Sequence, residues 1–116
     1  MYPSNPNLGP IINPQDVFAD YLTHKSGQGI VQPYLNTAGI AQQHGKEFMM
    51  FETNTASCGG FLGVSDSFGS ALWAVDYGLQ MAHSNFTGAL FHVGGQNVSY
   101  NVSVLLAQFV ARWFGC

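Results

Sequence analysis

Glu52 is the residue of this sequence best placed to do chemistry. It follows the apolar run Phe48-Met-Met-Phe51 and precedes a stretch of small polar residues and glycines over 53–60. A short apolar run bounded by turn residues predicts a strand buried on both faces, here over 47–51. In parallel α/β folds, functional side chains lie where strands end and the next loops begin. On position alone, Glu52 is therefore a candidate for a catalytic carboxylate, and a solvated or ion-paired glutamate is the alternative.

The segments before this strand are expected to be helical. Asn13 followed by Pro14 predicts the start of a helix, because asparagine is a common N-cap and proline is favoured in the first turn. Gly27 and Gly29 are expected to close that segment. A second, weaker helix is expected over 33–44.

The segments after the strand are expected to alternate helix and strand. Residues 53–64 read as a loop, and Ser65 is suited to cap a helix from about residue 66 to residue 83. The sequence GALFHV at 88–93 predicts a second buried strand. An apolar helix is expected over 102–114.

The helix over 66–83 has a regular apolar stripe. The stripe consists of Phe68, Leu72, Val75, Leu79 and Ala82. Residues at this spacing lie on one side of a helix. Trp73 lies alongside this stripe. Trp73, Phe68 and Leu72 are expected on the inward face of the helix, with a platform for a ligand as the alternative, and Asp76 is expected to be exposed or paired.

This order of elements predicts an α/β fold that is mostly helical and has two short parallel strands. Strands that alternate with helices favour βαβ units. Two parallel strands alone have little independent stability. The chain is therefore expected to be a piece of a larger α/β body.

Composition excludes several classes of function. Only 8% of the 116 residues are charged and the net charge is −3, with no basic cluster, which argues against nucleic-acid binding. No apolar run reaches the 18 or so residues that a membrane-spanning helix needs. No spacing of cysteine and histidine resembles a zinc site, and no metal or cofactor is expected.

The chain has glycosylation sequons typical of secreted proteins, but its first residues do not resemble a signal peptide. Glycosylation sequons begin at Asn85, Asn97 and Asn101. The N-terminus has neither the positive charge nor the apolar core of a signal peptide. Cys58 and Cys116 are compatible with a disulfide, with free thiols or with bonds to another chain.

The motif around Glu52 resembles a known family. MFETNTASCGGF, followed by VSDSFGSALWAVDYGLQMAHSNFTGALFHVGGQN, closely resembles the β-glucuronidases of glycoside hydrolase family 79, particularly fungal secreted members, and the family also includes heparanase-like enzymes. The resemblance covers about residues 2–101 and is densest over 48–101. It implies that 1–101 is the C-terminal part of a (β/α)8 TIM barrel, about strands seven and eight with their helices. Residues 102–116 would then be a divergent apolar helix.

The resemblance also implies roles for individual residues. Glu52 matches the nucleophile that ends barrel strand seven in a retaining β-glucuronidase. Gly59 and Gly60 match a loop that binds the carboxylate of a glucuronic-acid-containing glycan, although glycines needed only for a tight turn are an equal alternative. Tyr100 matches a tyrosine that donates to the same carboxylate, or it simply packs. His92, at the end of strand eight, is read as structural.

One catalytic group of the family has no counterpart in this chain. The family's general acid/base glutamate lies on strand four, before the point where the sequence begins. Glu47 lies about 16 Å from Glu52 along a strand, whereas retaining pairs are about 5 Å apart. Asp66 is expected to have a local role.

Three hypotheses follow. The chain is the nucleophile-bearing segment of a secreted β-glucuronidase, inactive alone and completed by the rest of the barrel. It is instead a non-catalytic product that binds uronic-acid glycans or self-associates. In the third, it is a small extracellular domain whose apolar terminal helix docks to a partner or a membrane surface.

Overall fold

The computed structural model describes residues 13–56, 59–93 and 100. Within them the order of elements is α1 (Pro14–Tyr21), α2 (His24–Val31), the short 3-10 helix η2 (Gln32–Tyr34), α3 (Leu35–Gln43), β1 (Met49–Thr53), α4 (Phe68–His83) and β2 (Gly88–Phe91). The expected α/β fold, mostly helical with two short parallel strands, is therefore confirmed at this level. The expected helix over 102–114, the boundary at 101/102, both cysteines, Asn97 and Asn101 lie outside the described residues.

The first helix begins where the sequence predicts but ends earlier. The Asn13 side chain accepts a hydrogen bond from the Gln15 backbone N–H at 3.1 Å, as an N-cap does. Gly27 and Gly29 do not close the segment, because both lie inside α2. Gly27 instead lets α2 approach α4 closely, since a Cβ there would lie 3.3 Å from the Tyr77 Cα.

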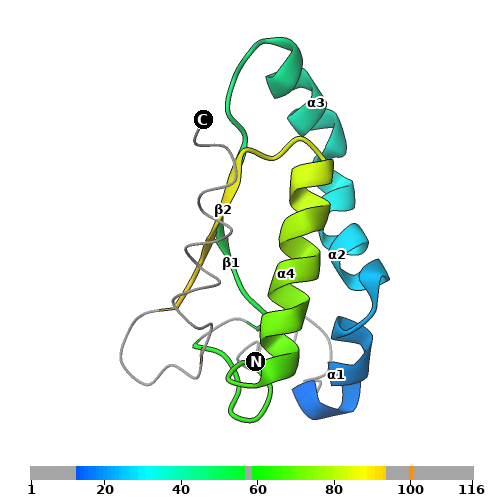
Figure 1. Ribbon diagram of the computed structural model, residues 1–116, viewed down its shortest axis with the longest axis vertical. Coiled ribbons are helices and arrows are strands. Elements are labelled where there is room, and N and C mark those ends of the chain that lie inside the picture. The colour runs from blue at the N-terminus through cyan, green and yellow to red at the C-terminus, as the bar shows by residue number, and fades with distance from the viewer. Residues whose placement is uncertain (1–12, 57–58, 94–99, 101–116) are drawn as a thin grey trace, which may run out of the picture.

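The two strands form a parallel pair, joined by α4. Met49 pairs with Gly88 and Met50 with Ala89. Figure 1 shows the pair on one side of α4 and the column of α1, α2 and α3 on the other. The main chain therefore makes a sheet layer, a layer of one central helix and an outer helical layer.

The expectation that these strands are buried on both faces is wrong for the described residues. Phe51 is 75% exposed and Leu90 is 45% exposed. The helices of the described chain all lie on one side of the sheet (Figure 1), so the other face of the strands lacks a helical cover from these elements.

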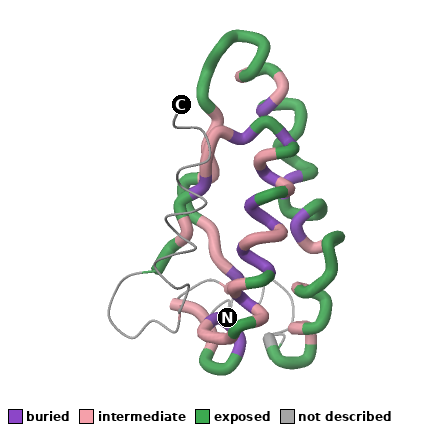
Figure 2. Tube along the Cα trace, in the orientation of Figure 1, coloured by how far each residue is buried: buried purple, intermediate pink, exposed green. Residues whose placement is uncertain are grey.

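The core surrounds α4, between the sheet and the outer helical layer. Its buried members are Val31, Ala38, Trp73, Ala74, Tyr77, Met81, Phe86 and Ala89. Trp73 stacks on Tyr77 with ring centroids 5.1 Å apart, and Phe91 of β2 contacts both rings edge-on. Figure 2 shows buried segments recurring along α4, which is the centre of the core.

The inward face of α4 differs from the expected one. Trp73 is buried as predicted, but Phe68 is 79% exposed and Leu72 is 53% exposed. The face toward the core is formed by Ser70, Trp73, Ala74, Tyr77, Gly78 and Met81. Since α4 carries apolar residues on most of its circumference, spacing alone does not identify the side that packs.

The start of α4 also differs by two residues. Its N-cap is Ser67, whose hydroxyl accepts from the Ser70 N–H at 3.2 Å, and not Ser65. Asp66 therefore precedes the helix and accepts a hydrogen bond from the Gly63 N–H. At the other end, Asn85 adopts a positive φ of 65° and its side chain is exposed, in the turn that leads to β2. Within the described residues no helix is both long enough and apolar enough to cross a bilayer.

Candidate functional site

Glu52 lies near the carboxyl end of β1, where the sequence places it. It is the last residue but one of the strand, and its side chain is exposed. Because β1 and β2 run parallel, both strands end at this edge of the sheet. Just beyond β2 the chain remains hydrogen-bonded to β1, since the His92 N–H donates to the Thr53 carbonyl at 3.0 Å.

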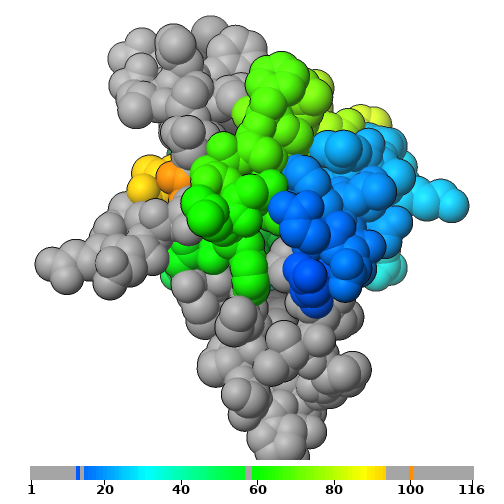
Figure 3. All heavy atoms as spheres, turned by 90° about the horizontal axis from the view of Figure 1, so that it is seen from below, coloured from blue at the N-terminus to red at the C-terminus, as the bar shows by residue number. Residues whose placement is uncertain are grey.

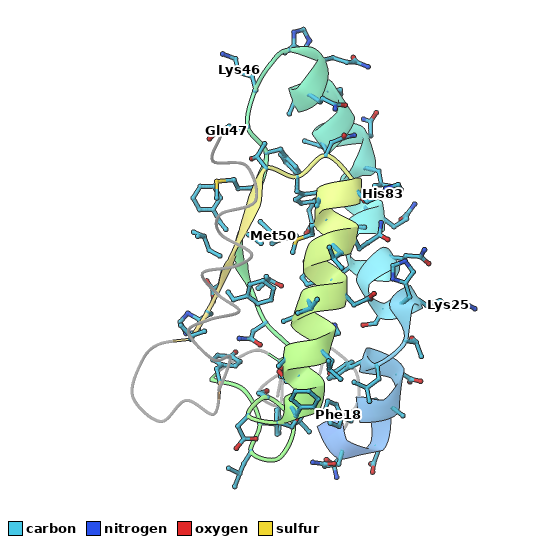
Figure 4. All side chains as sticks on the ribbon, in the orientation of Figure 1. Phe18, Lys25, Lys46, Glu47, Met50 and His83 are labelled. Atoms are coloured by element: carbon cyan, nitrogen blue, oxygen red, sulfur yellow. The ribbon has the colours of Figure 1, made fainter. Side chains whose placement is uncertain are left out.

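A bulge in β1 controls the direction of Glu52. Met50 pairs with Ala89 and Thr53 pairs with Phe91, so β1 uses one more residue than β2 over the same distance. Met50 packs against the core, as Figure 4 shows, and the Thr53 side chain lies against Tyr77. The two residues between them, Phe51 and Glu52, are both exposed.

Regular alternation would give Glu52 a different environment. Side chains two residues apart share a face of a strand, so Glu52 would follow Phe48 and Met50 toward the core. A buried carboxylate without a partner is strongly disfavoured. The extra residue removes that conflict, in the manner of bulges that redirect side chains near functional sites.

Position 60 requires glycine for two reasons: its backbone has a positive φ, and two neighbouring side chains leave no room for a Cβ. Gly59 and Gly60 have φ values of 92° and 81°, a region that side chains rarely adopt. A Cβ on Gly60 would lie 2.8 Å from ring carbons of Tyr100 and 2.9 Å from the Ser65 Cβ. The loop backbone is therefore held between these two residues.

Tyr100 joins the end of β2 to the loop that follows β1. Its ring meets the His92 ring edge-on, with centroids 5.5 Å apart. Its hydroxyl donates to the Ala56 carbonyl. The structure thus brings Tyr100 and Gly60 together, and it adds His92 to the same group. A ligand that takes a hydrogen bond from Tyr100 would compete with Ala56 for that proton.

A partly buried network of hydrogen bonds supports this loop, and no prediction from the sequence included it. The Ser65 hydroxyl accepts from the Thr55 hydroxyl at 2.8 Å and from the Phe61 N–H at 2.9 Å. Asn54 donates from its amide to the His92 carbonyl at 2.7 Å. The available signal was a serine and a threonine flanking paired glycines, which is also the composition of an ordinary loop.

Helix α1 holds the outer part of the same loop. The Gln15 side chain donates to the Gly63 carbonyl at 3.0 Å, across 48 positions of sequence. Figure 3, which views the molecule from the end where the strands finish, shows α1 beside this loop. The N-terminal helix therefore belongs to the support of the candidate site.

The charges of the described residues leave this edge of the sheet without an obvious cation. Lys46 and Glu47 lie before β1, at the opposite end of the strand (Figure 4), and Lys25 lies on α2. His24 of α2 pairs with Asp76 of α4 at 2.9 Å, so Asp76 is paired. An anion at the glycine loop would thus be bound by backbone amides and hydroxyls.

The chemistry available at this edge is that of one exposed carboxylate beside a glycine-rich loop. The Asp66 carboxylate is occupied by the Gly63 N–H at 2.5 Å, which agrees with a local role. Over the described positions, no group of three or more histidine, cysteine, aspartate or glutamate residues is arranged to hold a metal ion. The Glu52 carboxylate, by contrast, is exposed to solvent at this edge.

Comparison with known proteins adds no relative. No family model matches the chain, and neither the curated proteins nor the solved structures contain a match.

Proposed function

We propose that this chain is the nucleophile-bearing segment of a retaining β-glucuronidase barrel, with Glu52 as the nucleophile. The observation that carries the proposal is the bulge, which exposes Glu52 at the carboxyl edge of two parallel strands. Functional groups of parallel α/β folds gather at this edge. The resemblance of the surrounding motif to glycoside hydrolase family 79 supplies the reaction class.

In this mechanism a Glu52 oxygen attacks the anomeric carbon of a glucuronide. A covalent glycosyl ester forms as the bond to the leaving oxygen breaks, and that oxygen takes the bonding electrons. Water then cleaves the ester, and two inversions give net retention of configuration.

The proton for the leaving oxygen must come from outside the described residues. In retaining enzymes this proton comes from a carboxylic acid about 5 Å from the nucleophile. Glu47 precedes β1 and thus lies at its far end, while Asp66 accepts from Gly63. The chain alone is therefore proposed to be inactive on substrates whose leaving group needs protonation.

The substrate's own carboxylate is proposed to lie against Gly59 and Gly60. Glycine loops let backbone N–H groups approach an anion closely. Tyr100, whose ring covers Gly60, would donate to the same carboxylate after leaving Ala56. The exposed sequon at Asn85 is compatible with an extracellular enzyme.

Leaving-group dependence with azide tests this function. A dinitrophenyl glucuronide needs no protonation to react, and azide needs no general base to intercept the glycosyl ester. We expect purified chain plus azide to yield glucuronyl azide of retained configuration, and Glu52→Gln to abolish it. A substrate with a methoxyphenyl leaving group should remain intact. Product of inverted configuration, or equal yield from Glu52→Gln, would reject the proposal.

A second candidate function is non-catalytic association, and one observation favours it. Phe51, Phe68 and Leu72 are all more than half exposed. Phe68 and Leu72 lie one turn apart on α4, and a contiguous exposed apolar patch is typical of a surface that another polypeptide covers. This function predicts glycan binding or oligomers without any azide product, and sedimentation would detect the oligomers.

A further inference from the structure

Ser65 is buried in a way that its position in a glycine-rich loop does not suggest. The residue is 0% exposed. Its hydroxyl oxygen accepts two hydrogen bonds, from the Thr55 hydroxyl at 2.8 Å and from the Phe61 N–H at 2.9 Å. Buried polar groups are costly unless they are paired, so the loop geometry depends on both partners.

The network continues from Thr55 to the second strand. The Thr55 N–H donates to the Asn54 side-chain oxygen at 2.7 Å. The amide nitrogen of Asn54 donates to the His92 carbonyl at 2.7 Å. An unbroken path of hydrogen bonds thus runs from the end of β2, past the end of β1, to the backbone of Phe61.

The path ends beside the two glycines proposed to bind the substrate carboxylate. The Phe61 N–H belongs to the peptide unit that begins at Gly60, so Ser65 fixes the orientation of that unit. The Ser65 Cβ also closes the space at Gly60, where an added Cβ would lie 2.9 Å from it. Both contacts restrict the directions in which the neighbouring amides can point.

We infer that Thr55 and Ser65 are positioning residues for the carboxylate of the glucuronide. They hold the Gly59–Phe61 backbone at a fixed place relative to Glu52 on β1, so that the loop amides are already oriented when the anion arrives. Pre-organised donors avoid the cost of ordering at the moment of binding. This inference rests on the proposed function for its ligand, whereas the fixed loop itself can be measured without one.

The test compares four forms of the purified chain by amide NMR: wild type, Thr55→Val, Thr55→Ser and Thr87→Val. Valine removes the Thr55 hydroxyl at nearly constant shape, and serine keeps it. Thr87 is the control, because its hydroxyl is likewise hydrogen-bonded, in this case to the Phe48 backbone near the other end of the sheet. Two readouts are taken: hydrogen exchange at Phe61 and Gly60, and the shifts of these amides on titration with glucuronic acid, with glucose as the uncharged control.

We expect Thr55→Val to speed exchange at Phe61 by about threefold to tenfold, the range given by one hydrogen bond of ordinary strength. Glucuronic acid should bind Thr55→Val more weakly by a similar factor. Thr55→Ser should restore both values, and Thr87→Val should leave both unchanged while losing comparable stability.

The outcomes separate the two claims. If wild type shows no glucuronate-dependent shifts, the proposed function fails. If hydrogen exchange at Phe61 is nevertheless faster in Thr55→Val and unchanged in Thr87→Val, the claim that Thr55 and Ser65 fix the loop stands without the claim about the ligand. If exchange at Phe61 in Thr55→Val is no faster than in Thr87→Val, the inference is overturned whatever the ligand does. If the valine variant does not fold, the comparison of Thr55→Ser with Ser65→Ala decides in the same way.

Discussion

Met50 and Thr53 both face the helices of this protein, although regular alternation would put them on opposite faces of β1. Met50 pairs with Ala89, which is buried in the core, and Thr53 pairs with Phe91, which packs against the core. The bulge in β1 makes this possible, because it leaves Phe51 and Glu52 together on the exposed side of the strand. A carboxylate thereby reaches the exposed edge of the sheet without interrupting the core on either side of it.

The first prediction separates a functional role of Glu52 from a structural one. Glu52→Gln should change the free energy of unfolding by less than about 0.5 kcal/mol, because the side chain is exposed. Met50→Ala, two residues earlier, should cost about 1–3 kcal/mol because Met50 packs against the core. Urea denaturation of both variants measures the two values. A cost for Glu52→Gln equal to that of Met50→Ala would make Glu52 a structural residue.

The second prediction concerns Gly60 and its neighbours. Gly60→Ala should destabilise the protein by about 1–3 kcal/mol more than Gly45→Ala. Both glycines have positive φ, 81° and 61°, but a Cβ at Gly45 meets nothing within 4 Å while one at Gly60 meets Tyr100 and Ser65. The difference in urea midpoints therefore isolates the close approach from backbone strain. Equal losses in the two variants would show that Tyr100 does not pack on the loop.

The third prediction uses the phenol of Tyr77. Burial raises the pKa of Tyr77 above its ordinary value of 10.0, and a hydroxyl contact with Thr53 offsets part of that rise. The folded state therefore holds the proton more tightly than the unfolded chain. The stability associated with this group is complete below about pH 10 and is lost as pH rises further.

Tyr77→Phe should remove the part of the stability loss at alkaline pH that comes from ionisation of Tyr77. The Tyr77 hydroxyl is buried and makes no hydrogen bond of ordinary geometry, so at neutral pH the phenylalanine variant should equal or exceed wild type by about 0–1 kcal/mol. Thermal unfolding of both proteins between about pH 8 and 11.5 gives the comparison. Parallel curves across this range would refute the predicted shift.

The fourth prediction addresses the outward side of α4. Phe68, Leu72 and Leu79 are between 53% and 79% exposed there, so replacing Leu72 and Leu79 by glutamine should lower self-association with little loss of stability. The matched control is Trp73→Gln on the same helix, which should unfold the core because Trp73 is 4% exposed. Sedimentation velocity and circular dichroism report the two effects. Oligomers that persist in the glutamine variant would place association elsewhere.

The broad architecture could be read from local signals in the sequence. Asn13 and Pro14 mark a helix start because their preferences act within one turn, and the structure begins α1 there. The apolar runs around Met50 and Ala89 predicted two strands, and the long helix between them favoured the parallel pairing that the structure has.

The details of the candidate site could not be read in the same way. A bulge adds one residue to a strand and leaves no distinct pattern in the sequence, so the sequence could not show that Phe51 and Glu52 would both be exposed. Ser65 and Ser67 are equivalent as caps by composition, and only tertiary packing decides that Ser67 caps α4 while Ser65 is buried. The inward face of α4 was likewise settled by the neighbours of Trp73 and not by spacing.

The most direct test of the account is covalent labelling of Glu52. A glucuronyl fluoride with fluorine replacing the neighbouring hydroxyl loses fluoride without protonation and leaves a slowly hydrolysed ester on the nucleophile. Peptide mass spectrometry should locate one glucuronyl adduct on Glu52, absent from Glu52→Gln and weak with the corresponding glucosyl fluoride. No adduct on wild type, or an adduct on another carboxylate, would contradict the assignment of Glu52 as the nucleophile.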